Sequence, residues 1–183
     1  MLGNTRDRWG SVQVGLHWLI AALILLQIPA GLIMVSVSPG AFQNFLFTFH
    51  KNNGLIVLIL AVVRLIWRYR HPIPVLPGDM PPWQQAMARG THAALYILLF
   101  MMPISGFLYT AYGGYPVPFL GLVDLKNLVT PDKPMSEIWQ TMHLSLQWLL
   151  YLAVALHVGG ALNHHLVRKD GILRRMLPAG VNL

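Results

Sequence analysis

The chain has 183 residues, of which 55% are hydrophobic and only 10% are charged. A water-soluble domain usually carries about 25% charged residues, so the composition excludes a polar surface on all sides and predicts an integral membrane protein. The absence of cysteine excludes thiolate-ligated iron–sulfur clusters, cysteine-type zinc sites, disulfides and covalent haem attachment. The net charge of +7 comes largely from residues that flank apolar segments, which favours a membrane topology over a nucleic-acid partner.

Four apolar segments, at about 14–37, 45–67, 91–112 and 138–167, are each long enough to cross about 30 Å of hydrocarbon as a helix. They predict an all-α integral membrane four-helix bundle with up-down-up-down topology, in a single domain that covers residues 1–183. Pro29 and Pro103 fall inside two of the segments, where membrane helices tolerate proline as a kink. The proline-rich linker 68–90 is predicted to be non-helical, and the linkers 38–44 and 113–137 are predicted to be loops.

The distribution of lysine and arginine predicts the orientation. Positive residues concentrate on the cytoplasmic side of membrane proteins, so both termini are expected in the cytoplasm of a bacterial cell, with the chain in its inner membrane. The first segment is expected to be retained, because no small-residue cleavage site follows a short apolar core. Ten of the 13 basic residues fall on the predicted cytoplasmic side and three on the other, the ten being Arg6, Arg8, Arg64, Arg68, Arg70, Arg89, Arg168, Lys169, Arg174 and Arg175.

Histidines recur through all four segments. Ionisable residues are costly inside a membrane helix and usually mark a function. A histidine that caps a helix or bonds a neighbouring carbonyl is the ordinary alternative for any one of them, but six or more in four helices favour a shared role. They are His17, His50, His92, His143, His157 and His164, with His165 at the end of the last segment.

A spacing of 14 residues orders these histidines by depth. His143 and His157 lie on one helix face within roughly 40° of each other and about 21 Å apart along the axis. The same step leads from His17 to Gly31, from His50 to Arg64 and from His92 to Gly106. Because the helices alternate in direction, an inner level receives His17, Arg64, His92 and His157, and an outer level receives Gly31, His50, Gly106 and His143.

The outer level has the residues that a bis-histidine haem requires. Iron takes two axial imidazoles from facing helices, and glycines leave room for the flat macrocycle, although ordinary close helix packing also explains Gly31 and Gly106. Arg64 is suited to a haem propionate at the inner level, where either His17 or His92 is a candidate partner for His157. Zinc or copper would need three or four clustered ligands, and a proton relay would favour carboxylates, which the segments lack.

These residues resemble the bacterial cytochrome b561 family of di-haem membrane cytochromes. The matching stretches are GLHWLI, FHKNNGLIVLILAVVRLIWR, THAALYILLFMMPISGF and MHLSLQWLLYLAVALHVGGALNHH followed by VRKDGILRRMLP, which together cover nearly the whole chain. The resemblance implies two non-covalent b haems, the outer one on His50 and His143 and the inner one on His17 and His157. His92 is then expected beside the inner haem or at a quinone.

The family resemblance also implies an oxidoreductase that oxidises superoxide at the outer surface and reduces ubiquinone in the membrane. Lys51 follows His50 directly and is the candidate for steering an anion, although acidic residues on the long outer loop bring that side near neutrality. His164, seven residues past His157, is a candidate hydrogen-bond donor to a quinone or an interfacial residue facing lipid headgroups. For His165 the headgroup interpretation is favoured.

Two further functions remain open from the sequence. The chain could be a cytochrome b subunit that passes electrons between a dehydrogenase or carrier protein and the quinone pool. It could also be a haem-free, histidine-rich ion conduit. The small extramembrane mass favours the self-contained superoxide-oxidising enzyme over a subunit that docks a redox partner protein.

Overall fold

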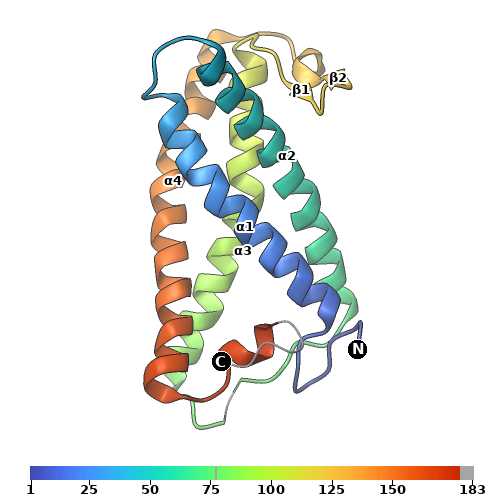
Figure 1. The fold of residues 1–183 in the computed structure, drawn as a ribbon, viewed down its shortest axis with the longest axis vertical. Coiled ribbons are helices and arrows are strands. Elements are labelled where there is room, and N and C mark those ends of the chain that lie inside the picture. The colour runs from blue at the N-terminus through green and yellow to red at the C-terminus, as the bar shows by residue number, and fades with distance from the viewer. Residues whose placement is uncertain (77, 178–183) are drawn as a thin grey trace.

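Four long helices run up and down in a single bundle in the computed structural model, which describes residues 1–76 and 78–177 (Figure 1). All four are long and apolar enough to cross a membrane, so the prediction of an all-α membrane bundle is confirmed. Met1 and the last described turn lie at the same end of the bundle, here named the inner end, and the opposite end is the outer end. The helices are α1 (Ser11–Met34), α2 (Ala41–Arg70), α3 (Pro82–Tyr112) and α4 (Lys133–Leu162).

The helices extend further than the hydropathy of the sequence predicted. The prediction that the linker 68–90 is non-helical is wrong at both of its ends, because α2 continues to Arg70 and α3 begins at Pro82. Proline is compatible with a first helical turn, where its missing N–H has no helical partner. In the same way α4 begins at Lys133, with Asp132 capping it by accepting a hydrogen bond from the Met135 amide at 3.0 Å.

Successive helices pack against each other, and a small apolar core joins three of them. It consists of Ile20 from α1, Val57 and Ala61 from α2, and Leu99 from α3, with Leu23, Ile24, Leu60, Tyr96 and Phe100 packed around it. Along each helix these residues fall between the two positions that are 14 residues apart. The core therefore separates the inner and outer levels that the sequence predicts.

The outer end is closed by a short hairpin that was predicted only as a loop. Its strands β1 (Pro118–Phe119) and β2 (Val123–Asp124) pair antiparallel and lead into the 3₁₀ turn η1 (Leu125–Leu128). Two side chains of α2 hold it: Lys51 Nζ donates to the Pro116 carbonyl at 2.6 Å, and Asn52 Oδ1 accepts from the Leu120 amide at 2.6 Å. The loop is thus attached to the helix that carries His50.

The inner end is completed by a hook after α4. A π-helical segment, η2 (Asn163–Arg168), runs into Lys169, whose φ of 54° is left-handed, and the 3₁₀ turn η3 (Leu173–Met176) follows. The Met176 carbonyl accepts a hydrogen bond from Trp18 Nε1 at 2.6 Å. The hook therefore returns to the first turns of α1.

Two glycines allow helices to approach each other at the outer level. A Cβ added to Gly31 would lie 2.9 Å from the His50 ring, and one added to Gly106 would lie 2.9 Å from the His143 ring. Real Cβ atoms essentially never make such short contacts. The absence of a side chain at these positions is therefore what lets each imidazole lie against the neighbouring helix.

We predict that Gly106→Ala displaces the His143 ring and lowers the stability of the bundle by about 1–3 kcal/mol, the usual cost of overpacking. Gly15→Ala is the control, since a Cβ there meets nothing within 4 Å and alanine favours helix. Thermal unfolding of both variants in detergent measures the difference. Equal melting temperatures for Gly106→Ala and the wild type would show that the ring has room to move.

Candidate functional site

His50 and His143 face each other at the outer level. Their ring centroids are 6.3 Å apart and the rings are nearly perpendicular, at 84°. The His143 Nδ1 atom lies 3.0 Å from the Met102 carbonyl and 3.1 Å from Ser105 Oγ, which itself donates to the same carbonyl. Since a carbonyl only accepts, His143 carries its proton on Nδ1, which leaves the lone pair of Nε2 free for a metal.

A buried polar bridge supports His50 from α1. Gln27 Nε2 donates to the His50 carbonyl at 2.9 Å, and Asn53 Nδ2 donates to Gln27 Oε1 at 2.7 Å and to the Leu23 carbonyl at 3.0 Å. The Nδ1 atom of His50 is buried and has no hydrogen-bond partner among the described residues. The sequence analysis did not identify Gln27, Asn53 or Ser105, although polar residues within apolar spans are a visible signal for them.

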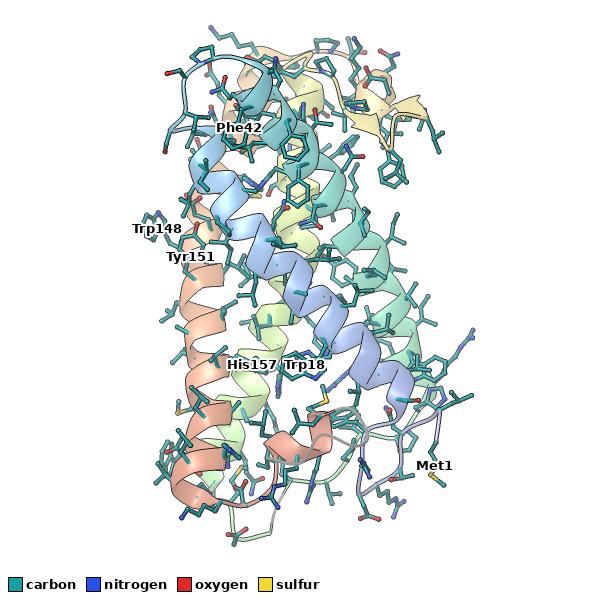
Figure 2. The ribbon with its side chains drawn as sticks, viewed as in Figure 1. Met1, Trp18, Phe42, Trp148, Tyr151 and His157 are labelled. Carbon is teal, nitrogen blue, oxygen red and sulfur yellow. The ribbon has the colours of Figure 1, made fainter. Side chains whose placement is uncertain are left out.

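His157 has two histidine neighbours at the inner level. The ring centroid of His17 lies 5.9 Å away, with the rings at 85°, and that of His92 lies 5.1 Å away, with the rings at 66°. Figure 2 shows His157 in the inner half of the bundle. The geometry therefore brings both candidate partners to His157, as the spacing predicted, and does not choose between them.

Arg64 completes the inner level. Its Nη1 atom lies 3.1 Å from His17 Nδ1, and its guanidinium carbon lies 5.7 Å from the centroid of the Tyr96 ring. The Nε atom of Arg64 is buried and has no partner among the described residues. This guanidinium thus has an N–H group free to donate a hydrogen bond inside the bundle, where the low dielectric makes such a bond stronger.

The paired histidines fit a metal that takes two axial imidazoles. Metal–imidazole bonds are about 2 Å long, so a shared metal would hold the two ring centroids roughly 6 Å apart. The observed separations of 6.3 Å and 5.9 Å match this value. Within residues 1–76 and 78–177, no three or more His, Asp or Glu side chains are grouped so that they could hold a metal ion by themselves. Gly31 and Gly106 leave the space that the His50 and His143 rings occupy.

His164 is paired with a carboxylate in the hook rather than free at the helix end. Its Nδ1 atom is hydrogen-bonded to Asp170 Oδ2, and the two side chains are only 13% and 9% exposed. Burial alone would raise the pKa of Asp170, but hydrogen bonds from His164, the Ile172 amide and Arg168 outweigh it and lower that pKa. Asp170 is therefore a carboxylate at neutral pH, which makes His164 Nδ1 the donor and leaves Nε2 for another partner.

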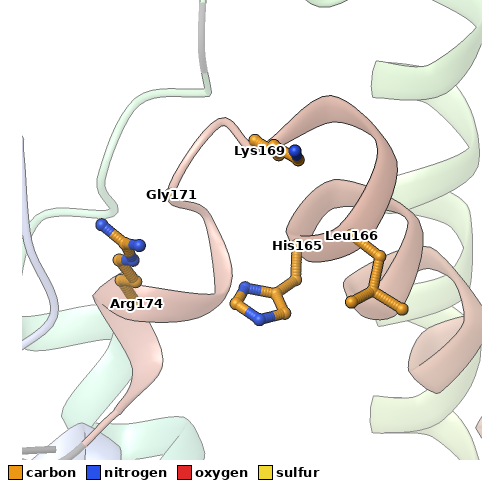
Figure 3. Close-up of a pocket in the computed structure, with 5 residues that line it drawn as sticks. All are labelled: His165, Leu166, Lys169, Gly171 and Arg174. Atoms are coloured by element: carbon orange, nitrogen blue, oxygen red, sulfur yellow. The ribbon is translucent and has the colours of Figure 1, made fainter. Parts of the chain in front are cut away.

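His165 lies on a different side of the hook. It lines a pocket of about 300 Å³ together with Leu166, Lys169, Gly171 and Arg174 (Figure 3). The pocket is separate from the two histidine levels. That His165 faces lipid headgroups stays a prediction.

The remaining predicted site residue, Lys51, is at the outer end and only one residue from His50. Its ammonium group is bound to the Pro116 carbonyl. It therefore anchors the outer hairpin to the helix that carries His50.

The comparisons with known proteins agree with this geometry. The model of the family described as prokaryotic cytochrome b561 matches residues 8–179. The chain is 31% identical to cytochrome b561 homolog 2 of Escherichia coli strain K12, over 95% of this chain and 93% of that protein. It is 30% identical to cytochrome b561 homolog 1 of the same strain, over 94% and 98% of the two chains. It is 26% identical to the probable superoxide oxidase CybB of Yersinia pestis, over 93% and 96%. The paired histidines thus belong to a membrane electron-transfer protein, and the chain is a member of the prokaryotic cytochrome b561 family.

Proposed function

We propose that this protein is an oxidoreductase of the bacterial inner membrane that oxidises superoxide at its outer end and reduces ubiquinone near its inner end. The observation that carries the proposal is the presence of two histidine pairs at two depths, separated by an apolar core. When bound, two non-covalent b haems supply one-electron redox centres at these depths. Both termini are cytoplasmic in this proposal, because the basic residues concentrate at the inner end.

His50 and His143 hold the outer haem in this proposal. The Met102 carbonyl fixes the tautomer of His143 in which Nε2 can ligate. Gly31 and Gly106 keep side chains away from the two rings. Gln27 and Asn53 fix the backbone of His50 against α1, so the ring is held from both sides.

His157 and His17 hold the inner haem, with His92 beside them. The choice of His17 over His92 rests on the family resemblance. Arg64 would change partners when the inner haem binds. His17 can ligate through Nε2 only when its Nδ1 carries the proton, whereas Arg64 donates a hydrogen bond to that Nδ1 in this structure. Ligation would release the guanidinium, which then has both a free fork and its unpaired Nε for a propionate carboxylate.

The overall reaction takes two electrons from two superoxide anions, which become two molecules of dioxygen. One ubiquinone accepts both electrons and two protons from the inner side to become ubiquinol. Lys51 supplies positive charge at the outer pair, where an anion would arrive. As an imidazolium, His164 would donate Nε2–H to a quinone carbonyl while the Asp170 carboxylate accepts from its Nδ1–H.

The similarity to a protein named probable superoxide oxidase supports superoxide as the donor. A cytochrome b subunit that accepts electrons from a dehydrogenase or carrier protein is the second candidate. The hairpin at the outer end is bound down on α2 by Lys51 and Asn52, and it offers little mass for docking such a partner.

We predict that His50→Ala and His143→Ala each lower the haem content from about two to about one per chain, because losing one axial imidazole removes a bis-histidine site. Pyridine haemochrome analysis of the purified proteins measures this. His71→Ala is the control, since His71 stacks on Trp67 outside both pairs and should not affect haem content. Two haems retained in either outer variant would disprove the pairing.

The function is tested on the purified holoprotein by rapid mixing, first with superoxide and then anaerobically with ubiquinone. Superoxide alone should reduce the haems, and ubiquinone should reoxidise them. In His164→Ala, reduction by superoxide and haem content should stay normal while reoxidation slows severalfold, because the quinone loses its hydrogen-bond partner. His165→Ala is the matched neighbour and should reoxidise at the wild-type rate.

Two other outcomes would redirect the proposal. Normal reoxidation in His164→Ala would move the quinone site, with His92 next to be tested. Absence of reduction by superoxide, together with reduction by a co-purifying redox protein, would favour the cytochrome b subunit.

A further inference from the structure

The hook at the inner end forms an open pocket whose lining residues belong to neither histidine level. It lies where α4 ends, between η2 and the turn that leads to η3 (Figure 3). Its volume is about 300 Å³. Three of the five lining residues are basic or titratable to a cation, and the full lining is His165, Leu166, Lys169, Gly171 and Arg174. A pocket with this lining is suited to an anion.

Among the described residues, no side-chain hydrogen bond or ion pair involves His165, Lys169 or Arg174. The adjacent basic residues differ: Arg168 contacts Asp170, Asp79 and Gln84, and Arg175 donates to the Val75 carbonyl at 2.8 Å. The hook thus commits some of its cations to folding and leaves others at the pocket.

The pocket is preformed by the hydrogen bonds of Asp170. This carboxylate accepts from His164, from Arg168 Nε at 3.2 Å and from the Ile172 amide at 3.2 Å. Arg168 in turn reaches Asp79 at 3.0 Å on the linker before α3. Lys169 and Gly171 have left-handed φ values of 54° and 74°, and such a conformation at a lysine persists only where the surroundings impose it. The direction of the chain around the pocket is therefore fixed before any ligand arrives.

One wall of the pocket continues into the lipid-facing surface. Leu166 lines the pocket and is 63% exposed, and the next residue, Val167, is 74% exposed. These apolar side chains lie in η2, at the end of the candidate membrane span Lys133–Arg168, and basic residues follow within a few positions. Outward from the bilayer, apolar side chains are followed by cationic side chains. A phospholipid has the matching order, with its acyl chains followed by its phosphate.

We propose that this pocket binds the phosphate of an anionic phospholipid of the inner leaflet, with Lys169 and Arg174 as its cations, His165 as a further donor and the acyl chain against Leu166. Basic pockets on the cytoplasmic side of membrane proteins recognise such headgroups. Lysine provides a point charge and arginine a fork of donors for phosphate oxygens. A zwitterionic phospholipid carries its own cation, which weakens its attraction to the same site.

Binding is measured by titrating the detergent-solubilised holoprotein with dioctanoyl phosphatidylglycerol, dioctanoyl phosphatidylcholine and inorganic phosphate in a calorimeter. Phosphatidylglycerol should bind and the other two only weakly. The double variant Lys169→Gln/Arg174→Gln should lose about tenfold or more in affinity, since each cation near an anionic headgroup contributes to binding. Arg8→Gln is the matched control, because Arg8 is an exposed cation at the same end of the bundle and outside the pocket.

The variant Asp170→Asn distinguishes binding in a pocket of fixed shape from general electrostatic attraction of anions to the inner end. This variant makes the inner end more positive, so general electrostatic attraction would strengthen binding. A pocket that depends on the hook predicts instead a severalfold loss of phosphatidylglycerol affinity. The proposal is overturned if phosphatidylcholine or inorganic phosphate binds as well as phosphatidylglycerol, or if the double variant binds like the wild type.

Discussion

The need of every polar group in a bilayer to find a partner inside the protein determines how this bundle is packed. No water is available in hydrocarbon, so an unsatisfied donor or acceptor costs several kcal/mol. His143 meets that requirement on the Met102 carbonyl and Asn53 on the Leu23 carbonyl, and Arg64 meets it in part on His17. These bonds turn the polar stripes of the helices toward each other. The bulk of the apolar side chains, Leu25 and Trp148 among them, consequently face outward.

The same requirement explains why the interior is layered. Where polar residues are 14 apart on a helix, they fall on one face at two depths, and mostly apolar residues lie between them. Those intervening residues form the core around Ala61, which is fully buried. Glycine opposite each outer histidine then lets the ring occupy space that a side chain would fill. The architecture follows from the polar positions first and from apolar packing second, the reverse of the order in a soluble domain.

This hierarchy decides what could be predicted from the sequence. The four spans and the levels of His17, His50, His143 and His157 follow from hydropathy and periodicity, because both are local properties of a helix. The helical turns at Pro82 and Lys133 were missed, since proline was taken as a helix breaker although it is compatible with a first turn. Ser105, Gln27 and Asp170 depend on which helices or turns meet, and the hairpin at 118–124 is held by long-range bonds to α2. The sequence marks Ser105 and Gln27 only as polar residues within apolar spans, and it carries no direct signal for the groups that these side chains contact.

The two ends of the bundle differ in how far acidic groups and carbonyls offset their basic side chains. At the outer end Lys51 is bound to a backbone carbonyl, and Lys126 lies 3.8 Å from Asp124, so local partners offset the few cations there. At the inner end Asp170 and Asp79 are both occupied by Arg168, and the other basic residues of the hook exceed the carboxylates available. An excess of cations at one end is the pattern that orients membrane proteins. In this chain four of the ten basic residues of the inner side lie in the hook, whose backbone is held by the hydrogen bonds of Asp170. An excess of positive charge orients a membrane protein whatever the arrangement of its residues. In this protein the cations of the hook also have fixed positions, and a fixed arrangement of cations can select among the anions that it attracts.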